Sequence, residues 1–296
     1  MNRRVFIQKS AALVAAGSIA GQDLWASSVA KRNKGRIGLQ LWSVKRLMPN
    51  DVVGTLKKVS DIGYSSIETF GEFKKGDLTF GHTTKELGKI ANDLGMTISG
   101  SMFQGWHMFP ENVNAPEWDD WKYCISEIQS VGAKWAIQAS MPGGKIKDMD
   151  GLKRVTDHFN RVGELCKQNG LKLAFHTHAP EFDFIDGVRI FDYLLDHTHP
   201  KQFFWQMDWG NVTNVGLDIM PYLPKYAGRF PLWHGTDYDA TGRKSMIAGE
   251  GDTNYPALFA RAKEFGLEQF TVEQHARQDD FEAITTVFNY FKQFVK

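Results

Sequence analysis

The amino-acid sequence predicts an α/β protein with a single (β/α)8 barrel, or TIM barrel, over residues 35–296. Three observations lead to this prediction. Eight short runs rich in Ile, Val, Phe and Trp alternate with stretches of helical periodicity. Successive runs begin about 28 to 38 residues apart, which is the length of one βα unit. Eight such units account for the whole region, and they leave no linker for a second domain.

Each predicted strand is a short hydrophobic run bounded by glycine or polar residues. The eight runs are residues 36–44, 65–71, 97–103, 134–140, 171–178, 202–210, 229–237 and 268–275. Between them, apolar residues recur at spacings of three and four, and a glycine often follows the last of them. The clearest predicted helices are residues 51–63, 83–95, 118–132 and 152–170.

Residues 1–30 have the features of a twin-arginine-type signal peptide. Arg3 and Arg4 precede a short apolar run over residues 11–21, and small residues follow it. No other stretch reaches the ~18 apolar residues that a membrane span needs. We therefore expect a periplasmic or otherwise exported protein, with no stable membrane insertion after signal removal. The alternative is a basic amphipathic start that stays on the protein.

The charge balance excludes one class of partner. The chain has 35 basic and 34 acidic residues, so its net charge is +1 and no basic stretch marks a nucleic-acid site. We therefore expect no nucleic-acid partner, and the sequence leaves an oligomer open. The two cysteines, Cys124 and Cys166, lie on helical patterns and are expected to be small buried residues.

Acid–base side chains cluster where the fifth predicted strand ends. Within "LAFHTHAPEF", His176 and His178 are two residues apart, so both side chains point to the same face of the strand. Glu181 follows just beyond. Unpaired imidazoles and carboxylates are costly to bury, so a single one here is usually a hydrogen-bonded core residue, but a cluster needs another explanation.

Carboxylates and imidazoles also end four other predicted strands. They are Glu68, Asp208, His234 followed by Asp237, and Glu273 followed by His275. In a (β/α)8 barrel the carboxyl ends of the strands meet at one face, where active sites lie. A ring of such groups is most simply stabilised by a cation, so we expect one divalent metal ion, which could be Mn, Co, Zn or Mg.

Several motifs occur together in one order along nearly the whole chain after residue 35. They are "IGLQLWSV", "IETFG", "AFHTHAPEF", "MDWGN", "LWHGTDYD", "AGEGDTNYPAL" and "VEQH". In this respect the sequence resembles the sugar phosphate isomerase/epimerase family of xylose isomerase-like TIM barrels. The resemblance implies a metal-dependent enzyme, but its reaction stays open, because that superfamily includes isomerases, epimerases, dehydratases, lyases and endonucleases.

The resemblance also implies a metal site with four protein ligands. Asp208, His234 and Glu273 match three of the family's ligands by position. At the strand-five position many relatives carry a Glu, whereas this chain carries His176. The fourth ligand is therefore either His176, which lies on the strand, or Glu181 from the loop that follows.

The catalytic residues implied by the resemblance are His178, Glu181 and Glu68. His178 matches the base of dehydratase members, and Glu181 or Glu68 would be the second acid or base. We expect the enzyme to remove a proton next to a carbonyl of a non-phosphorylated sugar or keto-sugar, as an isomerase or epimerase. The alternatives are a lyase or dehydratase that performs β-elimination on 3-keto-glycosides or keto-sugars, and an inactive sugar-binding barrel.

Other aromatic and histidine residues carry weaker expectations. Trp42, Trp106, Trp209 and Trp233 either line the pocket or pack in the core. Five histidines outside the predicted strand ends are expected to be solvated: His82, His107, His158, His197 and His199.

Overall fold

The computed structural model describes residues 37–71, 76–103, 109–110, 112, 114–141, 144–239, 241–242 and 244–295. The predicted signal peptide over residues 1–30 lies outside these ranges. No helix in the described ranges has both the length and the apolar character needed to cross a membrane.

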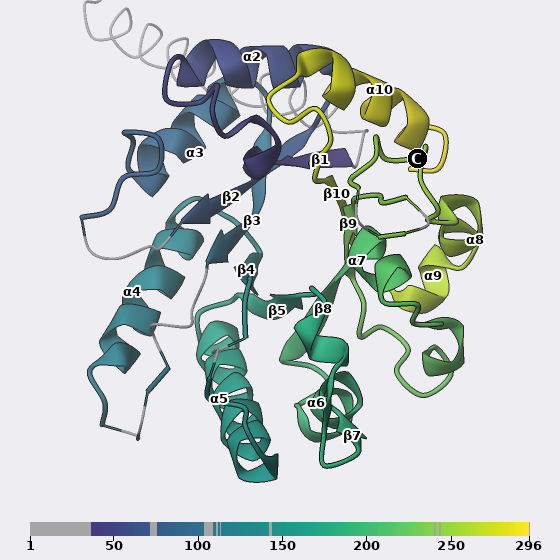
Figure 1. The fold of residues 1–296 in the computed structure, drawn as a ribbon. Helices are drawn as coiled ribbons and strands as arrows, with labels where there is room; N and C mark the ends of the chain where they lie inside the picture. The colour runs from purple at the N-terminus through teal and green to yellow at the C-terminus, as the bar shows by residue number, and fades with distance from the viewer. Residues whose placement is uncertain are drawn as a thin grey trace, which may run out of the picture.

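Eight parallel strands close into a barrel, as the sequence predicts (Figure 1). Around the barrel their order is β1-β10-β9-β8-β5-β4-β3-β2. The strands are β1 (Ile37–Gln40), β2 (Ser66–Gly71), β3 (Thr97–Phe103), β4 (Trp135–Gln138), β5 (Lys172–His176), β8 (Phe203–Asp208), β9 (Leu232–Gly235) and β10 (Gln269–Val272). Most of the predicted runs extend past the observed strands because their last residues belong to the loops at the barrel's mouth.

Helices surround the barrel and cover the outward faces of its strands (Figure 1). They are α2 (Val52–Ile62), α3 (Thr84–Asp93), α4 (Glu117–Ser130), α5 (Met149–Gln168), α6 (Ile190–His197), α7 (Trp209–Asn214), α8 (Tyr255–Ala260), α9 (Ala262–Phe265) and α10 (Phe281–Phe291). Short polar side chains fix several helix starts. Before α3, for example, Thr83 and Glu86 form a capping box that satisfies otherwise unpaired backbone N–H groups.

Among the described residues, the connections contain three short 3-10 helices and one small hairpin. The 3-10 helices are η1 (Leu41–Val44), η3 (Pro180–Phe182) and η4 (Met220–Tyr222). The hairpin pairs β6 (Phe184–Ile185) with β7 (Val188–Arg189) in the loop between β5 and α6. Of these, η1 and η3 directly follow the barrel strands β1 and β5, so they lie at the edge of the site described below.

The register between neighbouring strands brings polar residues side by side at the barrel's mouth. Gln40 on β1 is the partner of Glu68 on β2. His176 on β5 is the partner of Gln206 on β8. Further around the barrel, Asp208 at the end of β8 is the partner of His234 on β9. Parallel pairing therefore places polar residues that are far apart in sequence within contact distance.

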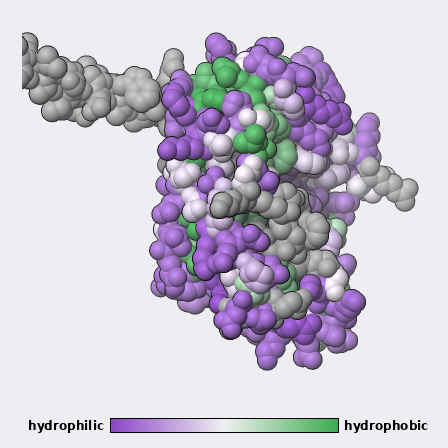
Figure 2. All heavy atoms as spheres, turned by 90° about the vertical axis from the view of Figure 1, so that its left-hand side faces the viewer, coloured by the Kyte–Doolittle hydropathy of each residue, from purple (hydrophilic) through white to green (hydrophobic). Residues whose placement is uncertain are grey.

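The core lies between the barrel and the helices and is rich in aromatic side chains. Trp209 and Trp233 are fully buried there with rings 5.0 Å apart, so of the two alternatives both belong to the core. Cys124 and Cys166 are buried free thiols, as expected. Figure 2 shows the side of the molecule that lies on the left in Figure 1. Its coloured surface is mainly hydrophilic, and hydrophobic side chains gather near its top.

One histidine expectation is wrong. His158 was expected to be solvated, but it is buried on the inner face of α5. Its ring lies 4.8 Å from that of Phe109 and 5.4 Å from that of Trp121. The periodicity of a helix places this position on its apolar face, and a neutral imidazole fits there. His197 and His199 are exposed as expected, and His82 is half-buried.

Candidate metal centre and its cavity

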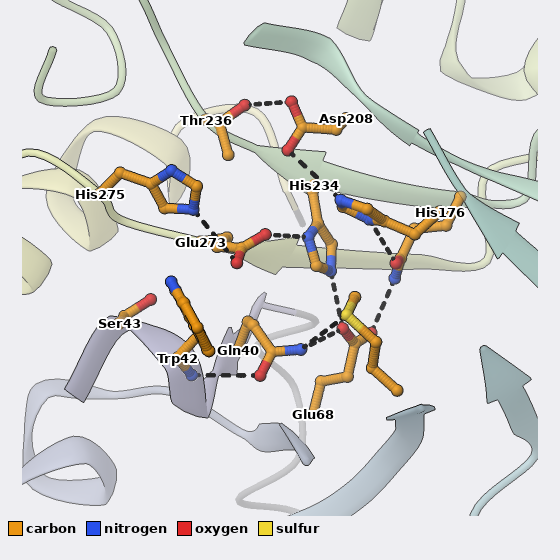
Figure 3. Close-up of polar contacts among 12 residues, drawn as sticks. Gln40, Trp42, Ser43, Glu68, His176, Asp208, His234, Thr236, Glu273 and His275 are labelled. Atoms are coloured by element: carbon orange, nitrogen blue, oxygen red, sulfur yellow. Dashed lines mark hydrogen bonds and ion pairs between the residues drawn. The ribbon is translucent and has the colours of Figure 1, made fainter. Parts of the chain in front are cut away.

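Four side chains from the ends of four adjacent strands converge at the carboxyl end of the barrel (Figure 3). They are His176, Asp208, His234 and Glu273, all of which are buried. One potential ligand atom from each lies within 4.8 Å of the other three. The cluster contains His176 and not Glu181, the other candidate for the strand-five ligand.

The donor set fits a divalent cation. Imidazole nitrogens and carboxylate oxygens bind zinc and similar ions at about 2.0–2.2 Å, so ligand atoms on one ion lie at most about 4.4 Å apart. The observed separation needs only a small closure to reach that range. Asp208 Oδ2 is buried and has no hydrogen-bond partner among the described residues, which is costly for a carboxylate oxygen unless a cation contacts it. The two negative charges of Asp208 and Glu273 also balance the two positive charges of a divalent cation.

Asp208 is held from one side. Its Oδ1 accepts a hydrogen bond from the Thr236 hydroxyl and another from the backbone N–H of Asn211, at 2.8 Å. Thr236 in turn accepts a bond from the backbone N–H of Gly210. Burial and the nearby negative charge of Glu273 raise the pKa of Asp208 to about 6. The fixed Oδ1 leaves Oδ2 turned toward the other members of the cluster.

His234 lies between two carboxylates. Its Nδ1 is 2.8 Å from Glu273 Oε2, and its Nε2 is 2.8 Å from Glu68 Oε1. Burial alone would lower the pKa of His234, but the charge of Glu68 and the bonds to both carboxylates raise it to about 10. Burial acts to raise the pKa of Glu273, yet hydrogen bonds from His234 and His275 bring it well below its usual range.

Glu68 lies below the cluster and is almost fully buried. Besides His234, it accepts hydrogen bonds from the amides of Gln40 and Gln206, both at 2.7 Å. Gln206 also contacts His176, with its Oε1 2.9 Å from the imidazole Nδ1. Glu68 therefore connects directly to one histidine of the cluster and through a single amide to the other.

A cavity of about 440 Å³ opens above the cluster. The described residues that line it are Gln40, Trp42, Phe70, Gly71, Met102, Ala139, Ser140, His176, His178, Glu273 and His275. None of these is a lysine or an arginine. One wall is polar and carries the imidazoles. Another part of the lining is apolar and carries Trp42 and Phe70, whose rings meet edge to face at 5.2 Å.

His178 and His275 are the two imidazoles of this wall outside the four-residue cluster. The ring of His178 lies 4.7 Å from that of His176, as expected from their spacing on one face of the strand. Burial against the cavity wall lowers the pKa of His178. Nε2 of His275 is 3.2 Å from Glu273 Oε1. Burial acts to lower the pKa of His275, but the bond to Glu273 outweighs it and raises this pKa.

Glu181 and Glu68, the predicted second acids or bases, are not among the residues that line the cavity. Glu181 lies buried on η3, where its carboxylate accepts a hydrogen bond from the backbone N–H of His178 at 2.7 Å. Burial raises the pKa of Glu181 to about 7. Asp237 is likewise structural, because its carboxylate accepts bonds from the backbone N–H groups of Gly249, Gly251 and Thr253.

Of the remaining candidates, Trp42 lines the cavity, whereas Trp106 and His107 lie outside the described residues. The sequence reasoning missed Gln40 and Gln206. Both positions carried a signal, because Gln40 ends a predicted strand and Gln206 is two residues before Asp208, on the same strand face. The sequence-based prediction of the site included carboxylates and imidazoles but no neutral amides.

Comparison with known proteins identifies the family. The family model described as "Xylose isomerase-like TIM barrel" matches residues 56–293. The chain belongs to this family. The family assignment agrees with the resemblance found in the sequence motifs, and the closed eight-stranded barrel agrees with it as well.

Individual relatives differ in the reaction that their names state. An inosose dehydratase from Geobacillus kaustophilus is 22% identical over 196 residues, which is 56% of this chain and 62% of the relative. The match thus spans less than two thirds of that relative's length. A sugar phosphate isomerase/epimerase structure from Parabacteroides distasonis is 25% identical, with a TM-score of 0.75 over 89% of this chain and 96% of that one. The IOLI protein, solved with a zinc atom, shares the fold at 15% identity, with a TM-score of 0.66 over 88% of this chain and 98% of that one.

Proposed function

We propose that this protein is a metal-dependent sugar-modifying enzyme that removes a proton next to a carbonyl and then expels a substituent from the β-carbon. It would act as a lyase or dehydratase on a non-phosphorylated keto-sugar or keto-glycoside. The observation that carries the proposal is the composition of the cavity wall. Two imidazoles outside the four-residue cluster, His178 and His275, line the cavity together with His176 and Glu273, whereas Glu68 and Glu181 are not among its described lining residues.

The metal site in this proposal consists of His176, Asp208, His234 and Glu273. A divalent ion held there would act as a Lewis acid and polarise the substrate carbonyl. The zinc atom of the structurally similar IOLI protein supports a bound metal ion in this protein, and the donor set is compatible with Mn, Co, Zn or Mg.

The proton transfers are assigned to the two imidazoles. His178 would accept the proton from the carbon next to the carbonyl, because it lies beside His176 and lines the cavity. The electron pair of that C–H bond then forms a C=C bond while the C–O bond at the β-carbon breaks. His275 would donate a proton to the departing oxygen, which leaves as water or as an alcohol. Each bond broken is thus balanced by one formed, and no oxidant or reductant is needed.

The substrate class follows from charge and from the shape of the wall. A phosphate group usually requires arginine, lysine or a set of backbone N–H groups, and no lysine or arginine is among the described cavity residues. A sugar ring has polar edges and apolar faces, which suits a cavity with one imidazole wall and one wall of Trp42 and Phe70. The inosose dehydratase relatives support elimination, since dehydration is the loss of a β-hydroxyl group.

Isomerisation or epimerisation is the second candidate. It is favoured by the likeness to the Parabacteroides distasonis isomerase/epimerase structure. An epimerase returns a proton to the opposite face of the carbon, so it needs a second acid on the other side of the substrate. Glu181, whose pKa is raised to about 7, would have to leave its bond to the His178 backbone to serve.

One experiment separates these reactions. Metal-loaded protein is incubated in deuterated water with a panel of free sugars, 3-keto-sugars and 3-keto-glycosides, and the products are analysed by mass spectrometry and NMR. Loss of water or of the aglycone would support elimination. Deuterium uptake without loss of a group would support isomerisation or epimerisation instead. If no compound of the panel reacts or exchanges, the binding protein without chemistry becomes the better interpretation.

We also propose that residues 1–30 direct export, which places the enzyme in the periplasm or outside the cell. The support is the sequence alone: paired arginines at positions 3 and 4 before a short apolar run and a small-residue segment. Twin-arginine export carries folded proteins, which suits an enzyme that binds a metal ion before export.

A further inference from the structure

Glu68 is surrounded by hydrogen-bond donors and is shielded from substrate. Its relative exposure is 1%, and it is absent from the described lining of the cavity. Side-chain nitrogens of Gln40, Gln206 and His234 lie 2.7–2.8 Å from its carboxylate oxygens. An ionised carboxylate can only accept hydrogen bonds, so each partner must present an N–H to it. This condition fixes the orientation of all three partners.

The orientation of Gln40 has independent support. Its Oε1 accepts a hydrogen bond from the backbone N–H of Trp42 at 3.2 Å, and a backbone N–H is always a donor. Its amide NH2 therefore points to Glu68. The backbone N–H of Trp42 thus fixes the orientation of Gln40 at one end of the hydrogen-bond network around Glu68.

The same reasoning determines the free nitrogen of His176. Gln206 donates its NH2 to Glu68 Oε2, so its carbonyl oxygen faces Nδ1 of His176. An oxygen acceptor requires the proton to be on Nδ1. The lone pair is then on Nε2, which points toward Asp208 Oδ2 at 4.0 Å.

His234 is fixed the other way round. Its Nε2 donates to Glu68, and its Nδ1 lies 2.8 Å from Glu273 Oε2. Glu273 is itself a proposed metal ligand, so a cation bound there would replace the proton on Nδ1, whereas the bond to Glu68 keeps the proton on Nε2. The two imidazoles of the cluster thus present different nitrogens. We propose that Glu68 is a positioning residue that selects Nε2 of His176 and Nδ1 of His234 as metal ligands, and that it takes no part in proton transfer. This inference rests on the proposed metal site but not on the reaction.

The test measures metal binding and the ligating nitrogens, without substrate. Zinc affinity is determined by competition with a chromophoric chelator for the wild-type protein and for Glu68→Gln. An amide at position 68 cannot accept from all three donors, so Gln206 must reverse or lose its bond. Loss of such an outer partner typically weakens metal affinity about 10–100-fold, and we expect an effect of this size. Asp237→Asn is the matched control, because Asp237 is also a buried carboxylate and its partners among the described residues are backbone N–H groups. The zinc affinity of this variant should stay within about twofold of wild type.

Histidine NMR gives the readout that a purely structural role would not change. In zinc-loaded protein labelled with 15N-histidine, we expect His176 bound through Nε2 and His234 bound through Nδ1. Gln206→Leu removes the acceptor of His176 Nδ1 and one donor to Glu68, but it leaves the bond between Glu68 and His234 Nε2 in place. We therefore expect this variant to change the His176 signals more than those of His234. If Glu68→Gln does not fold, Gln206→Leu still tests the inference.

Three results would overturn the inference. They are wild-type zinc affinity in folded Glu68→Gln, zinc bound through Nδ1 of His176 in the wild-type protein, or equal disturbance of both histidines in Gln206→Leu. If the wild-type protein binds no zinc, cobalt or manganese at all, the proposed metal site fails together with this inference. Zinc binding that is insensitive to Glu68 leaves the metal site intact and refutes only the positioning role.

Discussion

Replacing His158 by Leu should make the protein less sensitive to acid. His158 is buried on α5, and its two ring nitrogens have no hydrogen-bond partner among the described residues. Its surroundings are the rings of Phe109, Trp118, Trp121 and Phe159. Burial away from water disfavours the charged imidazolium and lowers the pKa of His158 to about 3.

The size of the effect follows from the difference between folded and unfolded pKa. An unfolded histidine titrates near pH ~6.5, so between about pH 6.5 and 3 the unfolded chain binds a proton here that the folded chain does not. The free energy of unfolding is therefore greatest above the unfolded pKa and falls as the pH drops through this window. Between pH 7 and pH 5 the loss that is due to His158 should be about 2 kcal/mol.

Urea unfolding at pH 7 and pH 5, for the wild-type protein and for His158→Leu, measures this quantity. Other groups also titrate in this range, but their contributions cancel when the pH difference of the variant is subtracted from that of the wild type. We expect the pH difference to be about 2 kcal/mol smaller in the variant. Equal pH differences in the two proteins would mean that His158 gains a partner for its proton, and the reasoning from burial would be refuted.

Three further predictions concern the site and export. His178→Ala should retain the metal, and its turnover should fall by about 10²–10⁴, the usual contribution of a general base. If this variant turns over normally while Glu181→Gln is inactive, Glu181 is the base instead. Asp208→Ala should lose the metal, as measured by elemental analysis after dialysis, while circular dichroism shows a folded barrel; stoichiometric metal in this variant would exclude Asp208 as a ligand. Changing Arg3 and Arg4 together to Lys should stop export of a reporter fused to residues 1–30, whereas continued export would indicate a general signal peptide.

Much of the site could be predicted from the sequence because parallel barrels have a strict geometry. Strands end at one face, so a polar residue at each strand end predicts a ring of polar side chains before any contact is known. That rule brought a larger set of strand-end residues to one face, and the resemblance then implied Asp208, His234 and Glu273 as ligands with either His176 or Glu181 as the fourth. The structure places His176 with the other three in one cluster. The spacing of two residues also placed His178 beside His176.

The direction in which a loop turns could not be predicted in the same way. Glu181 follows the strand by only a few residues, but η3 turns its carboxylate toward the backbone of His178 and away from the cavity. Glu68 is on a strand end, yet its carboxylate contacts Gln40, Gln206 and His234 and is not part of the described cavity lining. Sequence spacing fixes the face of a strand but not the depth that a side chain reaches.

The imidazole at position 176 determines the charge of the proposed metal site. The sequence resemblance leads to the expectation of a carboxylate at this position. A third carboxylate beside Asp208 and Glu273 would leave a buried site with net negative charge after a divalent ion binds. With His176 the two carboxylates balance the ion, which is the less costly arrangement in a cavity whose described lining has no lysine or arginine. An ion with fewer anionic ligands also withdraws electrons from a bound carbonyl more strongly. Gln206 fits this charge balance. Its amide oxygen accepts the hydrogen bond from Nδ1 of His176, and because the amide is neutral it adds no negative charge to the site.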